Sequence, residues 1–415
     1  MSSGEKPSAG NRLGKDLSLG DVKQALAAMQ GIVHTTPLDR SRTFSDLTGC
    51  DLYLKLENLQ KTGSFKIRGA FNKVRLLAPH EKACGVIAAS AGNHAQGVAY
   101  AAGMAGVPAT IVMPETAPLS KVMATRGYGA QVVLAGSGYD EAYARACEIQ
   151  RQEGRTFVHA FNDPAIIAGQ GTVGLEILAA LPDVAAIVVP IGGGGLISGI
   201  ALAVKEMAPA VKVYGVQAQG APAMYLSKRA GEPRSSGDAS TIADGIAVKA
   251  PGDITFPLID KYVDDIVLVD DEAIAGTILM LLERAKLMVE GAGAVSLAAV
   301  LNAKLTLKGK VVCVISGGNI DVNFIARIIE RGLIKAGRRA KISTLVPDRP
   351  GALNRLLSVI ARLRANVVHV YHDRVGRNVP LGQAVVEVSL ETRDWLHTEE
   401  ILATLQQEGY KVSIQ

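Results

Sequence analysis

Short apolar runs rich in β-branched residues alternate along most of the chain with alanine-rich stretches of helical length. Three successive pairs show the pattern, namely GVIAAS before HAQGVAYAAGMAG, ATIVMP before LSKVMATRGY, and AQVVLA before YDEAYARACEIQRQEG. The alternation continues to about residue 335, through AAIVVP, KVYGVQ and KVVCVIS. Because parallel strands are joined by helical crossovers, this pattern predicts an α/β fold in which helices cover both faces of parallel sheets.

The pattern changes after Lys341. The remaining segments are typical of strand, helix, strand, strand, helix and strand, in the order KISTLVP, GALNRLLSVIARLRA, NVVHVYHDRV, QAVVEVSLET, TEEILATLQQEG and YKVSIQ. This order predicts an α+β ferredoxin-like module. We therefore expect a flexible tail at 1–18, a large α/β domain at 19–335 with a smaller subdomain at roughly 58–160 nested within it, a linker at 336–340 and a second domain at 341–415.

One apolar stretch has about the length of a membrane span, because no charge occurs between Val184 and Val204. Four consecutive glycines follow Pro190 closely and would break a spanning helix. A strand at 185–189, a glycine turn and a helix at 196–207 account for the segment instead, so we expect no contact with a membrane.

Composition and charge exclude several function classes. The chain has 415 residues, of which 48% are hydrophobic, and a net charge of only +5. The densest basic run, at 331–341, contains no aromatic residue, which argues against nucleic-acid binding and suggests a solvated connector. The four cysteines are far apart and form no CxxC, so a zinc site or a disulfide framework is not expected. The N-terminus lacks the apolar core of a signal peptide, and we expect a cytoplasmic protein.

The glycine run indicates a phosphate site. A strand that ends at Pro190 is followed by Gly192, Gly193, Gly194 and Gly195, which open the next helix. Bare backbone N–H groups at a helix N-terminus bind phosphate without a cation. Neither GxxxxGK[ST] nor GxGxxG occurs, so the phosphate is expected to belong to a ligand other than a nucleotide.

Two further glycine-rich loops follow predicted strands, SAGNHAQG at 90–97 and SGGN at 316–319. Backbone N–H groups and the Asn93 amide could hold a carboxylate or a ring oxygen there. His94 has the surroundings of a buried, hydrogen-bonded histidine rather than of a base. Because ligands lie at the carboxyl ends of parallel strands, we expect all three loops to face one cleft.

Lys66 stands between Phe65 and Ile67 in KTGSFKIRGA, a setting that an exposed lysine does not need. A buried lysine has a lowered pKa and becomes a nucleophilic amine, as formation of an imine with an aldehyde requires. A phosphate cradle, a desolvated lysine and an asparagine together indicate pyridoxal 5'-phosphate.

Five motifs occur in sequence between residue 20 and about residue 335: ENLQKTGSFKIRGA, SAGNHAQG, GGGGL, TIADGIAV and SGGN. With them the sequence resembles the threonine dehydratases (threonine ammonia-lyases) of the tryptophan-synthase-like, fold-type-II group of pyridoxal phosphate enzymes. The resemblance implies two parallel-sheet subdomains. The C-terminal part resembles an ACT regulatory domain, with VPDRPGAL at its first strand-to-helix loop. One such domain matches the medium-length form of the family.

The resemblance also implies roles for individual residues. Lys66 would be the Schiff-base lysine, with Phe65 against the pyridine ring, Asn93 bonded to the ring 3-oxygen and Ser316 to the ring nitrogen. The phosphate would be held by Gly192, Gly193, Gly194, Gly195 and Leu196, and the substrate carboxylate by Ser90, Ala91, Gly92, Asn93 and His94. In this interpretation Gly63 and Gly69 let the chain approach the cofactor. A serine rather than a carboxylate at the ring nitrogen would make the cofactor a weaker electron sink, which favours loss of a β-leaving group.

The activity implied is deamination of L-threonine to 2-oxobutanoate and ammonia, and of L-serine to pyruvate, by a homo-oligomer that is a dimer or a tetramer. A branched-chain amino acid, isoleucine first, is the effector expected at the ACT domain. Serine racemases of this group carry a second serine where this chain has Ala91, and a metal-binding glutamate where it has Gln217, so we expect neither racemisation nor a metal site. A serine dehydratase or racemase-like enzyme and a non-catalytic amino-acid sensor are the alternatives.

Overall fold

The computed structural model describes residues 17–376 and 379–414, so the predicted tail at 1–18 lies almost wholly outside the described residues. The chain forms two compact units, of which the first ends at Ile320 and the second begins at Asp321. Each unit has its own sheets and its own buried cluster of apolar side chains. The predicted change of fold class along the chain is therefore confirmed.

The larger sheet of the first unit has six strands in the order β1-β2-β10-β7-β8-β9. Only the edge strand β1 pairs antiparallel, and the other neighbours are parallel. The bounds are β1 Leu38–Arg40, β2 Asp51–Leu56, β7 Ala186–Pro190, β8 Lys212–Ala218, β9 Asp265–Val269 and β10 Lys310–Ile315. The predicted strand at 185–189 is thus shifted by one residue.

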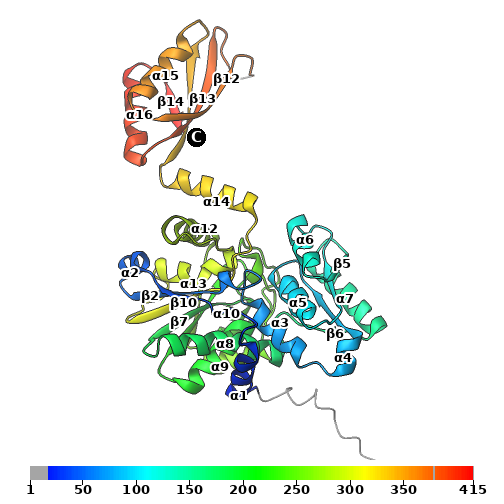
Figure 1. Ribbon diagram of the computed structural model, residues 1–415. Helices are drawn as coiled ribbons and strands as arrows, with labels where there is room; N and C mark the ends of the chain where they lie inside the picture. The colour runs from blue at the N-terminus through cyan, green and yellow to red at the C-terminus, as the bar shows by residue number, and fades with distance from the viewer. Residues whose placement is uncertain (1–16, 377–378, 415) are drawn as a thin grey trace, which may run out of the picture. The chain divides into compact units, whose positions relative to one another are not determined.

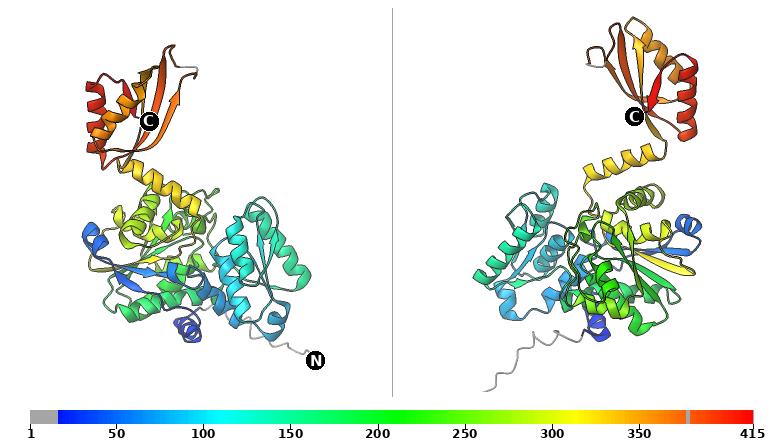
Figure 2. Two further views of the ribbon diagram at one scale, coloured as in Figure 1. Left: turned by 45° about the horizontal axis from the view of Figure 1, so that its top comes forward. Right: turned by 180° about the vertical axis from the view of Figure 1, so that it is seen from behind.

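The smaller sheet has four parallel strands in the order β5-β4-β3-β6. Its strands are β3 Val86–Ala89, β4 Ala109–Met113, β5 Gln131–Leu134 and β6 Thr156–Phe157. Helices α4 to α7 surround this sheet and form a lobe beside the larger one (Figures 1 and 2). The first unit therefore contains two parallel-sheet subdomains, as the resemblance implied.

Helices cover both faces of the larger sheet (Figure 1). The helices of the first unit are α1 Leu19–Met29, α2 Arg42–Thr48, α3 Lys66–Arg75, α4 Pro79–Cys84, α5 Asn93–Met104, α6 Leu119–Gly127, α7 Tyr139–Glu153, α8 Pro164–Ala180, α9 Gly195–Met207, α10 Ala223–Ala230, α11 Thr255–Tyr262, α12 Asp271–Met280 and α13 Gly291–Leu301. Helix α8 begins at Pro164 because a proline is tolerated where no intrahelical N–H bond is needed, and Asp163 caps the next two N–H groups.

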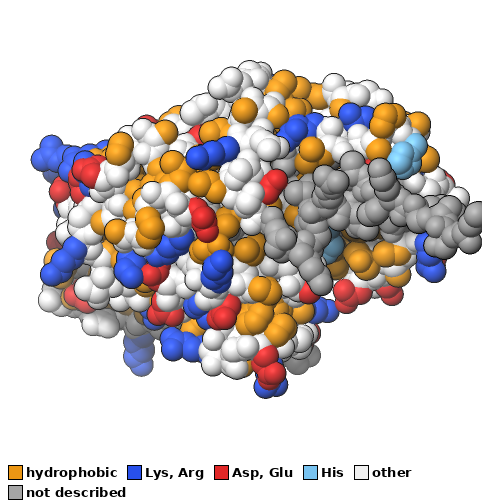
Figure 3. All heavy atoms as spheres, turned by 90° about the horizontal axis from the view of Figure 1, so that it is seen from below, with side chains coloured by type: hydrophobic (Ala, Val, Ile, Leu, Met, Phe, Trp, Pro, Cys, Tyr) orange, Lys and Arg blue, Asp and Glu red, His pale blue; other side chains and the backbone are white. Residues whose placement is uncertain are grey.

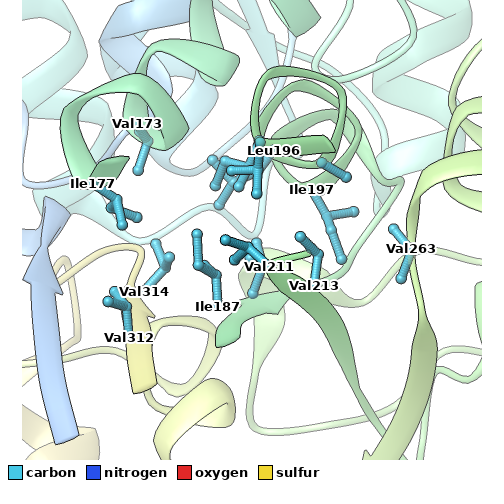
Figure 4. Close-up of a cluster of buried hydrophobic side chains, with 14 of the residues drawn as sticks. Val173, Ile177, Ile187, Leu196, Ile197, Val211, Val213, Val263, Val312 and Val314 are labelled. Carbon is cyan, nitrogen blue, oxygen red and sulfur yellow. The ribbon is translucent and has the colours of Figure 1, made fainter. Parts of the chain in front are cut away.

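The main core lies between helices α8 and α9 and the larger sheet. Val173 and Ile177 of α8 and Ile197 of α9 face Ile187 and Val312 of the strands (Figure 4). Each is 0% exposed. Both helices are apolar nearly all round, which is the pattern of helices buried between other elements. This packing holds the carboxyl ends of β7 and β10 side by side.

The second unit begins with α14 Val322–Lys335 and continues as β11 Arg339–Pro347, α15 Ala352–Arg362, β12 Asn366–Asp373, β13 Gln383–Glu391, α16 Trp395–Gln407 and β14 Val412–Ile414. Its antiparallel sheet has the order β12-β13-β11-β14. The predicted succession of elements and the ferredoxin-like topology are confirmed. Along β11, Ala340, Ile342, Thr344 and Val346 are buried, while the residues between them are more exposed.

One expectation needs correction. The basic run at 331–341 is not a connector, because it forms the end of α14 and the start of β11, with only residues 336–338 between them. Helix α14 lies in the compact unit that begins at Asp321, and the expected domain boundary at residue 335 stays a prediction.

The apolar stretch at 184–204 is divided between β7 and α9. None of the described helices is long and apolar enough to cross a membrane. On the face shown in Figure 3, hydrophobic side chains are scattered among charged and polar ones.

Candidate active site

The segment before α3 and the loop after β10 are joined through their backbones. Ser64 and Gly317 form an isolated antiparallel bridge, and the Phe65 N–H donates to the carbonyl oxygen of Ser316 at 3.2 Å. The Gly318 N–H donates in turn to the carbonyl oxygen of Gly63 at 2.9 Å. Two motifs that lie about 250 residues apart in the sequence therefore form one wall of the site.

Lys66 is the first residue of α3. Its Nζ donates to the carbonyl oxygen of Ala160 at 3.0 Å and lies 5.1 Å from the centroid of the Phe65 ring. Although part of the residue remains open, burial lowers the pKa of the amine to about 8, and the nearby Glu290 opposes the shift only partly. Lys66 can therefore lose its proton near neutral pH far more readily than a surface lysine.

The two glycines around Lys66 have other partners than expected. A Cβ on Gly63, whose φ is +71°, would lie 2.3 Å from Oδ1 of Asn319. A Cβ on Gly69 would lie 2.9 Å from the carbonyl oxygen of Ile166 and 2.5 Å from Nε2 of Gln170, both on α8. Gly63 thus admits Asn319 and Gly69 lets α3 pack against α8, and the expectation that both glycines let the chain approach the cofactor stays a prediction.

The SAGNH loop joins β3 to α5. The Ser90 N–H is already bonded to the carbonyl oxygen of Val112 at 3.0 Å, and the Gly92 N–H to Oγ of Ser90 at 3.2 Å. The N–H groups in the first turn of α5, at Asn93 and His94, have no intrahelical acceptor. The part of this loop best suited to a carboxylate is therefore the helix start rather than Ser90.

His94 is buried, and its Nε2 lies 2.8 Å from the carbonyl oxygen of Val158. Because a carbonyl only accepts, Nε2 carries the hydrogen. Burial, together with the charge of Lys66, lowers the pKa of His94 to about 3, so the ring is neutral. The prediction of a buried, hydrogen-bonded histidine is confirmed.

The glycine loop at 192–195 is packed on Phe161 and anchored by Thr255. A Cβ on Gly193 would lie 2.4 Å from the Phe161 ring, and one on Gly195 would lie 2.9 Å from the Phe161 Cα. Gly194 has φ +95° and caps α9. The Thr255 hydroxyl donates to the carbonyl oxygen of Gly193 at 2.7 Å. The loop needs glycine for contact with protein atoms as well as for backbone freedom, and it presents the N–H groups that begin α9.

Residues 158–162 connect Lys66 to this loop, and sequence reasoning did not single them out. Ala160 accepts from Lys66, while its neighbour Phe161 supports the glycines. His159 orders the turn, because its Nδ1 accepts the N–H groups of Phe161 and Asn162 at 3.2 and 2.9 Å. Burial, with Lys66 next in effect, lowers the pKa of His159, which keeps Nδ1 free to accept.

A buried ion network lies immediately behind Lys66. Arg68, two residues along α3, is 0% exposed and donates to Glu57 at 2.8 Å and to Glu176 at 2.6 Å. Lys55 reaches the other oxygen of Glu176 at 2.5 Å. Burial disfavours the charges, yet the Arg68 guanidinium holds the pKa of Glu57 below its usual value. The network joins the first turn of α3 to α8, to β2 and to the chain just after β2. The motif ENLQKTGSFKIRGA contains Glu57 and Arg68, but it gave no sign that they are buried partners of Glu176.

Three other residues named from the sequence are placed as follows. Ser316 is buried, and its Oγ donates to the carbonyl oxygen of Ala292 at 3.3 Å. Ala91 is half-buried at the start of the SAGNH loop. Gln217 is 0% exposed, and its Oε1 already accepts from the Tyr225 N–H at 2.8 Å. Within the described part of the chain, no group of three His, Cys, Asp or Glu residues could hold a metal ion.

Comparison with known proteins gives two family matches. Residues 29–317 match the model of pyridoxal-phosphate dependent enzymes, and residues 341–409 match that of ACT domains. The chain is 57% identical over 399 residues to an L-threonine ammonia-lyase of Thermotoga maritima, covering 96% of this chain and 99% of the relative.

Two solved structures are similar in fold to about three quarters of this chain. Processed threonine deaminase isoform 2 from Solanum lycopersicum has a TM-score of 0.72 and 38% identity, over 75% of this chain and 92% of that one. Maize serine racemase has a TM-score of 0.73 and 36% identity, over 77% of this chain and 98% of that one. Fold similarity alone therefore does not separate deamination from racemisation.

Proposed function

The chain belongs to the family of pyridoxal-phosphate dependent enzymes and carries an ACT domain, and from this premise we propose that it deaminates L-threonine to 2-oxobutanoate and ammonia. The observation that carries the proposal is the amine of Lys66, desolvated and connected through Ala160 and Phe161 to a glycine cradle at a helix start. We further propose L-serine as a second substrate, a homo-oligomeric assembly and a cytoplasmic location.

The residues present fit pyridoxal phosphate. Lys66 Nζ would hold the aldehyde carbon covalently, and the N–H groups at 192–196 would bind the phosphate. The Ser316 hydroxyl can accept from the ring nitrogen, or donate to it by giving up its bond to the carbonyl oxygen of Ala292. Among the described residues, the hydroxyls of Thr62 and Ser64 are buried without a hydrogen-bond partner. The segment before Lys66 therefore still has polar groups available to a ligand.

When bound, the cofactor supplies an electron sink that acidifies the Cα–H of an amino acid. The protein supplies the base and the orientation. Lys66, released from the cofactor, would take the Cα proton, and the N–H groups that begin α5 would hold the substrate carboxylate. Asn93 would fix the ring through its 3-oxygen. The β-hydroxyl would take up one proton and leave as water, and hydrolysis of the released product would give the 2-oxo acid and ammonia.

The proposed activity is tested by assaying the full-length protein with L-threonine and L-serine. We expect the 2-oxo acid and ammonia in equal amounts, and little D-amino acid in the remaining substrate, because a single lysine cannot remove and return a proton on opposite faces.

Ala91→Ser should increase D-serine measurably by supplying a hydroxyl on the second face. Chiral chromatography that finds substantial D-serine with the wild type would favour the serine racemase alternative, and absence of any 2-oxo acid would contradict the proposal.

We propose a branched-chain amino acid, isoleucine first, as the ligand of the ACT domain. Gly351 has φ +86° and caps α15, so the helix start presents free N–H groups in the VPDRPGAL loop. A Cβ on Gly351 would meet no other atom, so Gly351→Asp should fold despite the strain that φ +86° imposes on a residue other than glycine, and it would add a negative charge at the helix start.

We expect isoleucine to change the KM for threonine of the wild type by about 5- to 150-fold. Gly351→Asp should lose this response while its turnover without isoleucine stays unchanged. Gly409→Asp, at another glycine of positive φ with open space in the same unit, is the matched control and should keep the response. Calorimetry without heat on addition of isoleucine, valine or leucine to the wild type would refute the proposed ligand.

A further inference from the structure

Glu290 is a buried carboxyl in the candidate site to which neither the sequence motifs nor the roles proposed above give a task. It is 5% exposed and caps α13, and its own N–H donates to the carbonyl oxygen of Gly317. Its Oε1 accepts from Nδ2 of Asn93 at 2.6 Å. A Cβ on Gly317 would lie only 2.3 Å from the same oxygen, so the first glycine of SGGN leaves space for this carboxyl.

Asn93 has a second partner, which fixes the directions in which its amide oxygen and its NH2 group face. Its Oδ1 accepts from Nδ2 of Asn319 at 2.8 Å, and the same Nδ2 donates to the carbonyl oxygen of Thr62 at 2.8 Å. A backbone carbonyl can only accept, so Asn319 must present its NH2 group to Thr62 and to Asn93. Asn93 must then turn its oxygen toward Asn319 and its NH2 group toward Glu290.

Glu290 ends this hydrogen-bond chain with an acceptor oxygen. One N–H of Asn93 is committed to Glu290, and the other N–H remains for a ligand. Without an acceptor at position 290, the amide of Asn93 would keep one anchor instead of two. Because a buried polar chain is strongest when each member is satisfied, loss of the terminal acceptor weakens the whole chain.

We propose that Glu290 is a positioning residue, which together with Asn319 holds the Asn93 amide in the one orientation that offers an N–H to the ring 3-oxygen of pyridoxal phosphate. The inference rests on the proposed role of Asn93. It deepens the proposed function by assigning a task to a residue that the family motifs quoted above do not contain.

The charge of Glu290 adds a pH dependence. Burial, with Asp244 next in effect, raises its pKa to about 7, against the opposing effects of the Asn93 hydrogen bond, Lys121 and Lys66. Below this pH the carboxyl is neutral and above it carries a negative charge two hydrogen bonds from the ring oxygen. The light absorption of the bound cofactor should therefore change with pH around the midpoint of this titration.

The test uses the full-length holoenzyme, three single variants and the double variant that combines Glu290→Leu with Asn319→Asp. Glu290→Gln keeps an acceptor oxygen without a charge, and Glu290→Leu removes the acceptor at similar size. Asn319→Asp removes the NH2 group that donates to the oxygen of Asn93. Equilibrium dialysis gives the Kd for pyridoxal phosphate, and the absorbance of the bound cofactor is followed from about pH 5.5 to about pH 8.5. Glu148→Gln, on the exposed surface of α7, is the control.

We expect Glu290→Leu and Asn319→Asp each to raise the Kd at least about tenfold, as loss of a hydrogen bond to a buried group does. Glu290→Gln and the control should stay within about threefold of the wild type. The effects of Glu290→Leu and Asn319→Asp should be less than additive in the double variant, because both break one chain. The wild-type absorbance should show an inflection near pH 7 that Glu290→Gln lacks.

Wild-type affinity in Glu290→Leu, or an equal loss in Glu290→Gln and Glu290→Leu, would overturn the positioning role. Unchanged affinity for pyridoxal phosphate in Asn319→Asp would show that the hydrogen bonds from Asn319 through Asn93 to Glu290 do not hold Asn93 in place. If Glu290→Leu does not fold, as judged by circular dichroism, Glu290→Gln and Asn319→Asp still decide the question. A wild-type protein that binds no pyridoxal phosphate would overturn the proposed function as well, whereas failure of the variants alone leaves that function standing.

Discussion

Replacement of Lys66 by alanine is expected to reduce deamination of L-threonine at least about a thousandfold, because it removes both the covalent anchor of the cofactor and the proposed base. The amine is the desolvated group with a pKa lowered to about 8, and its removal leaves the carbonyl oxygen of Ala160 without this donor. The loss should appear in kcat as well as in kcat/KM. Borohydride reduction followed by mass spectrometry should find a pyridoxyl adduct at position 66 of the wild type only.

Lys61→Ala is the matched control, since Lys61 lies in the same segment and has no part in the proposed site. It should keep turnover within about threefold and leave the adduct at Lys66 unchanged. Retention of a tenth of the wild-type activity by Lys66→Ala would show that another group performs the chemistry.

Replacement of Arg68 by methionine is expected to lower the free energy of unfolding by about 3–5 kcal/mol, because it leaves Glu57 and Glu176 buried without their central partner. The guanidinium bonds both carboxylates and also reaches the hydroxyl of Thr172 at 3.1 Å. Denaturant titration of the first unit's unfolding transition measures the change.

Arg75→Met tests whether the effect is specific to the network. Arg75 is on the same helix, but its Nε donates to Oδ1 of Asn72 at 2.8 Å, and the side chain remains half-exposed. We expect this control variant to lower the free energy of unfolding by about 1 kcal/mol or less. An equal cost for both variants would mean that Arg68 contributes packing only and that its ion pairs add nothing.

Local sequence patterns predicted the fold class, the succession of elements in both units and the positions of most strands and helices. This success has a physical reason: alternation of apolar runs with amphipathic stretches dictates parallel sheets, and a glycine run after a strand dictates a turn into a helix. The buried, hydrogen-bonded state of His94 followed from its apolar surroundings and is confirmed. The domain boundaries and the individual site roles remain predictions.

The error at 331–341 shows the limit of reading charge alone. A dense basic run was interpreted as a connector, yet it forms the end of α14 and the start of β11. The helical pattern stands just before the run, where Ile325 and Ile328 are three positions apart and buried, because a helix with one buried side tolerates many charges on the other.

The sequence by itself determined that the glycine run at 192–195 and the loop that holds Asn93 follow parallel strands, because each is part of a local motif whose backbone geometry follows from its glycines and neighbours. Only the tertiary structure decided which partners complete them. Glu290 meets Asn93 across 197 positions of sequence, and Arg68 meets Glu176 across 108. Such contacts depend on how helices and sheets pack, and the burial that shifts the pKa values of Lys66 and Glu290 arises from the same packing.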